Sequence, residues 1–239
     1  MADRGQFTTT RWTLVLAAKN RHDPAGSQAF SQLCERYYEP LYSYLRRRGY
    51  TLEDAQDLTQ GFMTRLIEKD ALHHADPARG RFRAFLLTSL KHYVSNEHAR
   101  AGAAKRGGGV PTLSLDVEVA ESRYRLQARD DLTPERLYDR RWALAVLERA
   151  LAQLRAEFRA VGREAFFDAM HGSLTGDAES ASHREIGDRF GMTENAVKVA
   201  VHRMRRRYRA LLRAEVAAMV ESEREVEDEL RYLRSALVP

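Results

Sequence analysis

Residues 182–213 read SHREIGDRFGMTENAVKVAVHRMRRRYRALLR and predict two helices separated by a short turn. Ser182 and Glu185 have the spacing of a capping box, so the first helix is expected to begin there. Gly191 can adopt the left-handed conformation that ends this helix, and Thr193 can cap the second helix. The stretch therefore has the layout of a helix-turn-helix.

The second of these helices has an apolar face and a polar face. Its apolar positions recur every three or four residues, at Val197, Val201, Met204, Tyr208 and Leu211. The polar face carries residues suited to contacting DNA, namely Glu194, Asn195, Lys198, Val199, His202, Arg203 and Arg206. Six arginines occur between Arg203 and Arg213, and such like charges repel unless a polyanion meets them. DNA contact is therefore favoured over the alternative, an ordinary helical hairpin with a solvated basic face.

Composition and length set the outer limits of the prediction. The 239 residues include 39 Lys and Arg and 34 Asp and Glu, a net charge of +5, and fit a mainly helical protein of one or two domains. Cys34 is the single cysteine, which excludes an intramolecular disulfide, and its apolar helical neighbours predict a buried thiol. No stretch approaches the about 20 apolar residues that cross a bilayer, and the N-terminus lacks a signal-peptide core. We therefore expect a cytoplasmic protein without membrane contact.

The N-terminal part of the chain predicts three helices. A short apolar helix is expected in residues 10–18, and a long amphipathic helix in residues 27–48. Pro40 lies inside the long pattern and should kink the helix or divide it in two. Thr51 and Asp54 form a second capping signal, and the helix that follows is acidic near its N-terminus, where the helix dipole favours negative charge.

Residues 81–106 combine an apolar face with an exposed mixture of basic, aromatic and amide side chains. Those suited to contacting DNA are Arg81, Arg83, Lys91, His92, Tyr93, Asn96, Arg100, Lys105 and Arg106. Cations for phosphates beside planar groups for stacking are typical of a surface that binds single strands. On composition alone, a solvated basic helix is an equal alternative.

The remaining segments predict a linker, a second helical unit and a C-terminal helix. Residues 107–133 keep no period and indicate a linker, whereas Pro134 begins a helix behind Thr133. Residues 172–181 indicate a flexible loop before the helix-turn-helix. Beyond Arg213, an amphipathic helix is expected, with a net charge of −4 over residues 221–231. A helix packed on the body of the protein is favoured there, and a regulatory segment is the alternative.

Taken together, these segments resemble the extracytoplasmic-function group of the sigma-70 family, the bacterial RNA polymerase initiation factors. FSQLCERYYEPLYSYLRRRG, EDAQDLTQGFMTRL and FRAFLLTSLKHYVSNEHARA are similar to region two, and EIGDRFGMTENAVKVAVHRMRRRYRALL is similar to region four. The stretches TRWTLVLAA and TPERLYDRRWAL are similar to a subgroup with longer ends. DAQDLTQ followed by a helix-turn-helix at this separation is more specific than either motif alone.

The resemblance implies an all-α fold of two helical domains joined by a flexible linker. The expected divisions are an N-terminal extension (1–26), region two (27–106), the linker (107–133), region four (134–214) and an acidic C-terminal helical extension (215–239). It also implies a promoter-specificity subunit without catalytic activity or cofactor. Its partners would be core RNA polymerase and promoter DNA, as duplex and as melted strand.

The resemblance also implies a role for each segment. Core polymerase would bind the acidic helix through Asp54, Asp57, Leu58, Gln60 and Phe62. Residues 82–106 would capture the melted strand of the proximal promoter element, and the linker would run toward the polymerase active centre. The helix-turn-helix would read the distal element, with Asn195, Lys198, Val199, His202 and Arg203 in the major groove and Arg205, Arg206, Arg207 and Arg209 on phosphates.

Several positions depart from the family pattern. Gln56 stands where many members have Glu, and His92 and Asn96 match the usual Asn and Asp of the strand-capturing helix, so promoter specificity does not transfer. Some groups with reduced acidity resemble targets of Ser/Thr kinases, so phosphate on Thr59 or Thr51 would restore charge. A Thr59 that is only a helix-surface residue is the favoured alternative. An anti-sigma factor is a further candidate partner.

Three other functions remain as alternatives. A free-standing helix-turn-helix regulator would leave DAQDLTQ and residues 81–106 unexplained, and a purely helical adaptor would leave the arginines unexplained. An enzyme is disfavoured, because neither the residues around His73, His74 and Asp76 nor those around Asp54 have an H-E-x-x-H spacing, and no glycine-rich phosphate loop follows a strand. No catalytic or metal site is therefore predicted.

Overall fold

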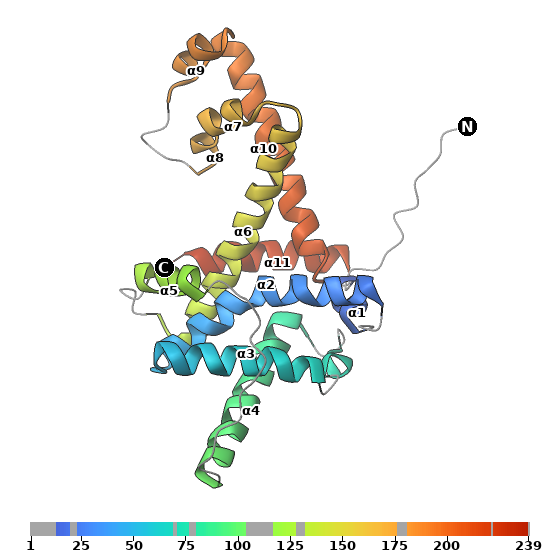
Figure 1. Ribbon diagram of the computed structural model, residues 1–239. Helices are drawn as coiled ribbons and strands as arrows, with labels where there is room; N and C mark the ends of the chain where they lie inside the picture. Colours follow the sequence, from blue (N-terminus) through green and yellow to red (C-terminus); the bar gives the residue numbers. More distant parts are fainter. Residues whose placement is uncertain are drawn as a thin grey trace, which may run out of the picture. The chain divides into compact units, whose positions relative to one another are not determined.

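The protein was analysed as a computed structural model that describes residues 13–19, 23–68, 71–76, 80–103, 117–127, 132–175, 181–220 and 222–238. These residues form helices, turns and loops without a strand, which confirms the all-α prediction (Figure 1). Trp12, Lys105 and Arg106 lie outside the described residues. The helices are α1 (Thr13–Lys19), α2 (Pro24–Arg47), α3 (Leu52–Glu68), the 3-10 helix η1 (Ala71–His74), α4 (Phe82–Ala103), α5 (Val117–Gln127), α6 (Pro134–Ala160), α7 (Glu164–Met170), α8 (Gly172–Thr175), α9 (His183–Phe190), α10 (Glu194–Ala217) and α11 (Glu223–Leu237).

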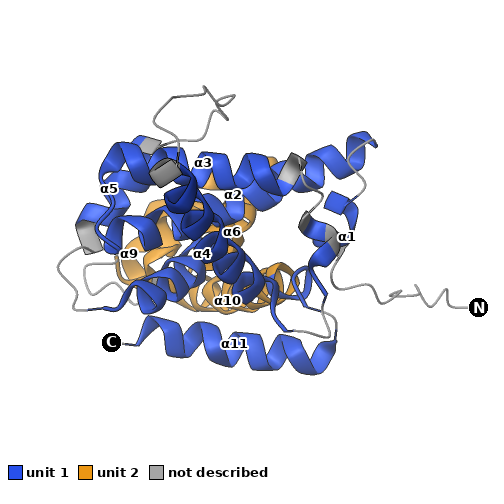
Figure 2. Cartoon of the chain, turned by 90° about the horizontal axis from the view of Figure 1, so that it is seen from below, with its two compact units in different colours: residues 1–145, 216–239 blue, residues 146–215 orange. Residues whose placement is uncertain are grey.

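The chain forms two compact units (Figure 2). Unit 1 comprises residues 1–145 and 216–239, and unit 2 comprises residues 146–215. This division differs from the boundaries expected at 134 and 214, because the first turns of α6 and residues 216–239 belong to unit 1.

Helix α2 is the central element of the unit 1 core. Asp23 caps it by accepting a hydrogen bond from the Ala25 N–H, and Pro24 occupies its first turn, where a missing N–H costs nothing. The helix therefore begins earlier than the residue 27 expected from the sequence. Pro40 lies inside one continuous helix, so of the two outcomes expected there, a kink or a division, the division does not occur. Cys34 is buried as predicted, and burial, followed by the charge of Glu35, raises its pKa to about 12.

Helices α3 and α4 follow the caps and glycines that the sequence provides. The Asp54 N–H donates to Thr51 Oγ1, which confirms the predicted start of α3. Gly61 is buried on α3 and lies against the hydroxyl of Tyr93 on α4, so a Cβ at position 61 would overlap that oxygen. The Tyr93 ring also packs on Phe62, with 5.8 Å between ring centroids. The absence of a side chain at Gly61 thus permits α4 to lie close to α3.

Part of the predicted linker is a helix packed on α2. Helix α5 begins at Val117, so residues 117–127 are not the unstructured connection expected from the sequence. Glu121 on α5 accepts hydrogen bonds from Tyr42 Oη at 2.6 Å and from Arg46 Nε at 3.0 Å. Arg46 Nη2 adds a third bond at 3.1 Å, and Arg123 on α5 pairs with Glu39 on α2. Two ion pairs between distant segments therefore attach α5 to α2.

The C-terminal helix α11 also packs into unit 1. Val226 and Leu233 are buried, and Glu229, 3% exposed, forms ion pairs with Arg81 and Arg83 at the start of α4. This arrangement agrees with the favoured expectation of a helix packed on the body of the protein.

Unit 2 contains the helix-turn-helix. The Ser182–Glu185 capping box is present, Gly191 has φ of 64°, and the Ala196 N–H donates to Thr193 Oγ1, so the three local predictions are confirmed. The apolar face of α10 packs with α6, α7 and α9 in one core, which includes Leu154, Phe166, Phe167, Met170, Ile186, Val197, Val201 and Met204. Residues 172–175, expected as a loop, form the short helix α8.

Candidate nucleic-acid interface

The outward face of α10 is the first candidate surface. Asn195, Lys198, Val199, His202 and Arg203 are all exposed, as the sequence predicts. Val199 is 43% exposed and is one of the few large apolar side chains on the surface among the described residues. Lys198 pairs with Glu194 one turn earlier, at 2.6 Å, which keeps the two charges of this face side by side.

The arginines of α10 differ in their partners. Arg205 Nη2 donates to the Ser173 carbonyl at 2.7 Å, and Arg207 pairs with Glu157 at 2.5 Å. Both were expected to hold phosphates, but each already has a partner within unit 2. Arg203, Arg206 and Arg209 are exposed and form no ion pair with another described residue. These three are therefore the guanidinium groups of α10 that are available to a polyanion.

The helix-turn-helix depends on a glycine that the sequence analysis did not single out. A Cβ at Gly187 of α9 would lie 2.6 Å from the Met192 carbonyl oxygen, which is backbone of the turn. Only a residue without a side chain permits this approach, so Gly187 sets the distance between α9 and the turn that leads into α10. The signal was present in the sequence as a glycine inside a helical pattern.

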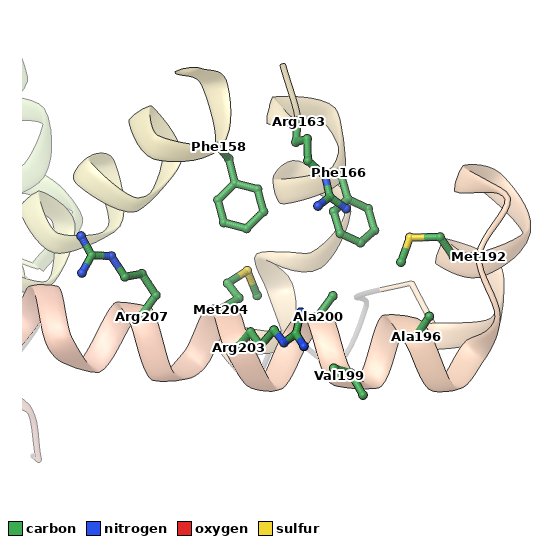
Figure 3. Close-up of a pocket in the computed structure, with 10 residues that line it drawn as sticks. All are labelled: Phe158, Arg163, Phe166, Met192, Ala196, Val199, Ala200, Arg203, Met204 and Arg207. Carbon is green, nitrogen blue, oxygen red and sulfur yellow. The ribbon is translucent and has the colours of Figure 1, made fainter. Parts of the chain in front are cut away.

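A pocket of about 490 Å³ lies beside α10 (Figure 3). Its walls come from α6, α7, the turn and α10, with Phe158, Phe166, Met192 and Met204 among the apolar residues. Arg163, Arg203 and Arg207 also line it, and the Arg163 guanidinium lies 4.7 Å from the centroid of the Phe166 ring. The pocket places apolar surface next to the exposed residues Val199 and Arg203.

Helix α4 is the second candidate surface, and its cations are less free than the sequence suggests. Arg83 is only 8% exposed, so its side chain does not lie on the exposed side of α4 as the sequence predicts. Its guanidinium lies between the rings of Trp142 and Tyr232, 4.9 Å and 3.8 Å from their centroids. Arg81 and Arg83 both pair with Glu229 on α11.

Farther along α4, the predicted residues are exposed to different degrees. Lys91 pairs with Glu135 of α6 at 2.8 Å, and Arg100 pairs with Glu97 on the same helix at 2.8 Å. Tyr93 is half-buried against Phe62, whereas His92 and Asn96 are exposed. The C-terminal part of α4 extends away from the other helices of unit 1 (Figure 1).

The acidic face of α3 is the third candidate surface. Asp54 and Asp57 are exposed and Leu58 is half-buried, as a docking face requires. Gln60 and Phe62 are buried, so the expected outward position of Gln60 is wrong. Gln60 instead contacts Tyr38, whose pKa is raised to about 12 chiefly by burial and lowered in part by the hydrogen bond with Gln60.

Thr59 does not lie on the surface of α3. Its side chain is fully buried, and its hydroxyl donates to the Ala55 carbonyl at 2.6 Å. A kinase cannot reach this oxygen while α3 is folded, so the structure contradicts both a surface Thr59 and its use as a phosphate acceptor. Thr51 is exposed, and its hydroxyl donates to Asp54 at 2.8 Å.

None of the described helices has the length and apolar character that a membrane span needs. Nor do the described residues gather three or more His, Cys, Asp or Glu side chains in a group able to hold a metal ion.

Comparison with known families bears on the first part of the chain. Residues 33–104 match the family model of sigma-70 region 2, a segment that contains the whole of α3 and α4 and less than a third of the 239 residues. Comparisons with curated proteins and with solved structures gave no match. The resemblance of the second part to region four and of the chain to the extracytoplasmic-function group stays a prediction. The matched segment, which begins inside α2 and contains α3 and α4, is therefore similar to sigma-70 region 2.

Proposed function

We propose that the protein is a promoter-specificity subunit of bacterial RNA polymerase that binds core enzyme and recognises promoter DNA at two places. The match of residues 33–104 to sigma-70 region 2 carries this proposal. The helix-turn-helix of unit 2 supports it independently, because α10 presents exposed cations and polar groups along one face. The proposed role is binding and positioning, without catalysis or a cofactor.

In this proposal α10 reads the distal promoter element as duplex. Asn195, Lys198 and Arg203 lie on the exposed side of the first three turns, where a recognition helix contacts base edges. Arg206 and Arg209 follow on the same helix and have no ion-pair partner among the described residues, so they are suited to phosphates.

Helix α4 then captures the melted strand of the proximal element. His92 and Asn96 are exposed near the middle of α4, and Tyr93 lies between them in sequence with a half-buried ring. Planar side chains of this kind can stack on or hydrogen-bond to unpaired bases. Arg100 is exposed on the same helix and can exchange Glu97 for a phosphate.

Core polymerase binding is assigned to the exposed part of α3. Asp54 and Asp57 provide its negative charge, and half-buried Leu58 provides an apolar contact. Gln60 and Phe62 are left out of this surface because both are buried, and they support it by holding α3 in unit 1.

Reconstitution with core RNA polymerase tests the proposal. The full chain should co-purify with core enzyme, and the complex should select promoter fragments from a random pool. Asp54→Asn together with Asp57→Asn should weaken co-purification, whereas Glu118→Gln, an exposed carboxylate elsewhere in unit 1, should not. A protein that selects duplex DNA equally well without core enzyme would instead be a free-standing helix-turn-helix regulator.

Single substitutions on α10 separate base reading from phosphate contact. Arg206→Ala should weaken binding about equally for all selected sequences and reduce the slope of log affinity against log salt by about 1. Arg203→Ala should relax preference at one position of the distal element, at a cost of about 1–3 kcal/mol for the preferred base. Equal effects of the two substitutions on all sequences would contradict base reading by Arg203.

A further inference from the structure

The contact between α11 and α4 brings an acidic helix onto basic residues of the proposed strand-binding element. Residues 223–237 include five acidic and three basic residues, and Ser222 caps the helix by accepting from the Glu225 N–H. Most of these charges lie on the exposed or half-buried side, but Glu229 faces inward and is 3% exposed. A buried carboxylate needs a cation, and Glu229 has two, Arg81 and Arg83.

Three segments far apart in the sequence meet at Arg83. Its guanidinium lies 3.8 Å from the Tyr232 ring of α11, 4.9 Å from the Trp142 ring of α6, and 3.5 Å from the Asp139 carboxylate. The Tyr138 hydroxyl donates to the Arg83 backbone carbonyl at 2.9 Å. Without α11, this guanidinium would lose both Glu229 and the Tyr232 ring that covers it.

Arg81 is the outer member of the pair. Its side chain is 35% exposed, although the Nη1 atom that meets Glu229 is buried. A guanidinium at this place could accept a phosphate once Glu229 has moved away. The surface uncovered by moving α11 would consist of Arg81, Arg83 and the Trp142 ring. Cations beside an aromatic ring are the groups that bind the phosphates and bases of a single strand.

We propose that α11 is a displaceable acidic cover over a single-strand nucleic-acid site formed by Arg81, Arg83 and Trp142. This inference rests on the proposed function, because it extends the strand-binding surface of α4 toward the N-terminus of that helix. Glu229 occupies the place that a phosphate of the strand takes when the site is open. Binding of a strand and docking of α11 therefore exclude each other.

The physical basis is competition between a carboxylate and a phosphate for the same guanidinium groups. Removing the charge of Glu229 leaves buried Arg83 without its closest counter-ion, which disfavours the docked state of α11. The released arginines then gain affinity for the negatively charged strand. This gain depends on salt, because each phosphate that is neutralised releases counter-ions.

Glu229→Gln tests the cover in the full chain, with an oligothymidine as the probe. We expect the variant to bind the probe about tenfold more tightly than the wild type, which is the effect of about one charge-assisted hydrogen bond. Its affinity for the probe should also fall more steeply with salt concentration. Glu227→Gln makes the same charge change on the exposed side of α11 and should bind like the wild type. The double variant with Arg81→Gln and Glu229→Gln should lose most of the increase in affinity for the probe.

Hydrogen exchange of the α11 amides shows whether the helix is displaced. In the wild type, the probe should accelerate exchange over residues 223–237, and Glu229→Gln should show faster exchange without the probe. If Glu229→Gln releases α11 but binds the probe no more tightly, α11 is only a structural cap and the proposal is wrong. If it changes neither exchange nor affinity, the proposal is also wrong.

Should Glu229→Gln not fold, Tyr232→Leu removes the ring over Arg83 without changing charge and should shift affinity in the same direction by a smaller factor. Promoter opening by the wild type with core polymerase is measured in parallel. If that complex opens promoters and Glu229→Gln behaves as the wild type throughout, only the cover fails. If no complex opens a promoter, the proposed function fails.

Discussion

The two basic helices of the protein, α4 and α10, look alike in sequence but differ in the structure. On α4 and directly before it, Arg81, Arg83, Lys91 and Arg100 each pair with a carboxylate, and three of them use carboxylates that lie more than forty residues away in the chain. On α10, Arg203, Arg206 and Arg209 are exposed without an ion-pair partner among the described residues. Basic composition therefore indicates contact with nucleic acid only where the fold leaves the charge available.

This difference follows from how each unit is built. Unit 1 collects segments from both ends of the chain, so α5, the start of α6 and α11 bring carboxylates to α2 and α4. Unit 2 is one continuous segment whose core lies on the apolar face of α10, which leaves the opposite face to solvent. Substitutions in each unit test whether its stability depends on local or on distant contacts.

Gly187→Ala tests the local construction of unit 2. The added Cβ would overlap the Met192 carbonyl, and because this atom is backbone, α9 and the turn must move apart. We expect a loss of about 3 kcal/mol in the free energy of unfolding of unit 2 and loss of duplex binding. Urea-dependent hydrogen exchange of the buried amides of α10 measures the change in the free energy of unfolding. Asp188→Ala, the exposed neighbour, is the control and should change little.

Glu121→Gln tests the distant pairing in unit 1. The side chain would keep its shape but lose the charge that Arg46 and Tyr42 contact, so we expect a loss of about 2 kcal/mol in the free energy of unfolding of unit 1. Exposed Glu118→Gln on the same helix should have little effect. Equal stability of the two variants in urea would show that α5 is held by other contacts.

The same carboxylate predicts a dependence on pH. Burial raises the pKa of Glu121, but hydrogen bonds from Arg46, Tyr42 and Arg125 outweigh it and hold the pKa below its ordinary value of 4.5. The contribution of Glu121 to stability is therefore complete above about pH 4.5 and is lost as the pH falls through the lower pKa of the folded state. Urea unfolding of the wild type and Glu121→Gln at a series of acidic pH values should show the two stabilities converging as the pH falls.

Ser182→Ala removes the cap of α9. The Glu185 N–H would lose its acceptor, so we expect a loss of about 1 kcal/mol in the stability of unit 2 and no change in unit 1. Ser182→Asp keeps an acceptor and should restore most of this stability. If hydrogen exchange shows that unit 1 also loses stability, the two units do not unfold separately.

Lys91→Gln removes the most exposed of the distant ion pairs in unit 1. Both Lys91 and Glu135 are more than 40% exposed, so water screens their attraction, and we expect the free energy of unfolding to change by less than about 1 kcal/mol. Lys91→Arg should be neutral. A large loss in thermal or urea unfolding would mean that this pair, and not the contacts of Arg83, fixes the start of α6 on α4.

Local signals in the sequence predicted local structure well. The caps at Thr51 and Ser182, the left-handed Gly191 and the apolar face of α10 each depend on residues within a few turns, and each is confirmed. The burial of Arg83, Gln60 and Thr59 could not be predicted in the same way. Arg83 and Gln60 contact side chains such as Glu229, Tyr232 and Tyr38, whose distance in sequence carries no signal of contact.

In the proposed function, the protein opens promoters only together with core polymerase, with α10 on duplex and α4 on the melted strand. Fluorescence of a base analogue placed in the proximal element of a selected promoter measures melting directly. We expect the signal to rise only when protein and core enzyme are both present, and to fall strongly in Asn96→Ala. Binding of the duplex by the protein alone, with no melting after core enzyme is added, would contradict the claim.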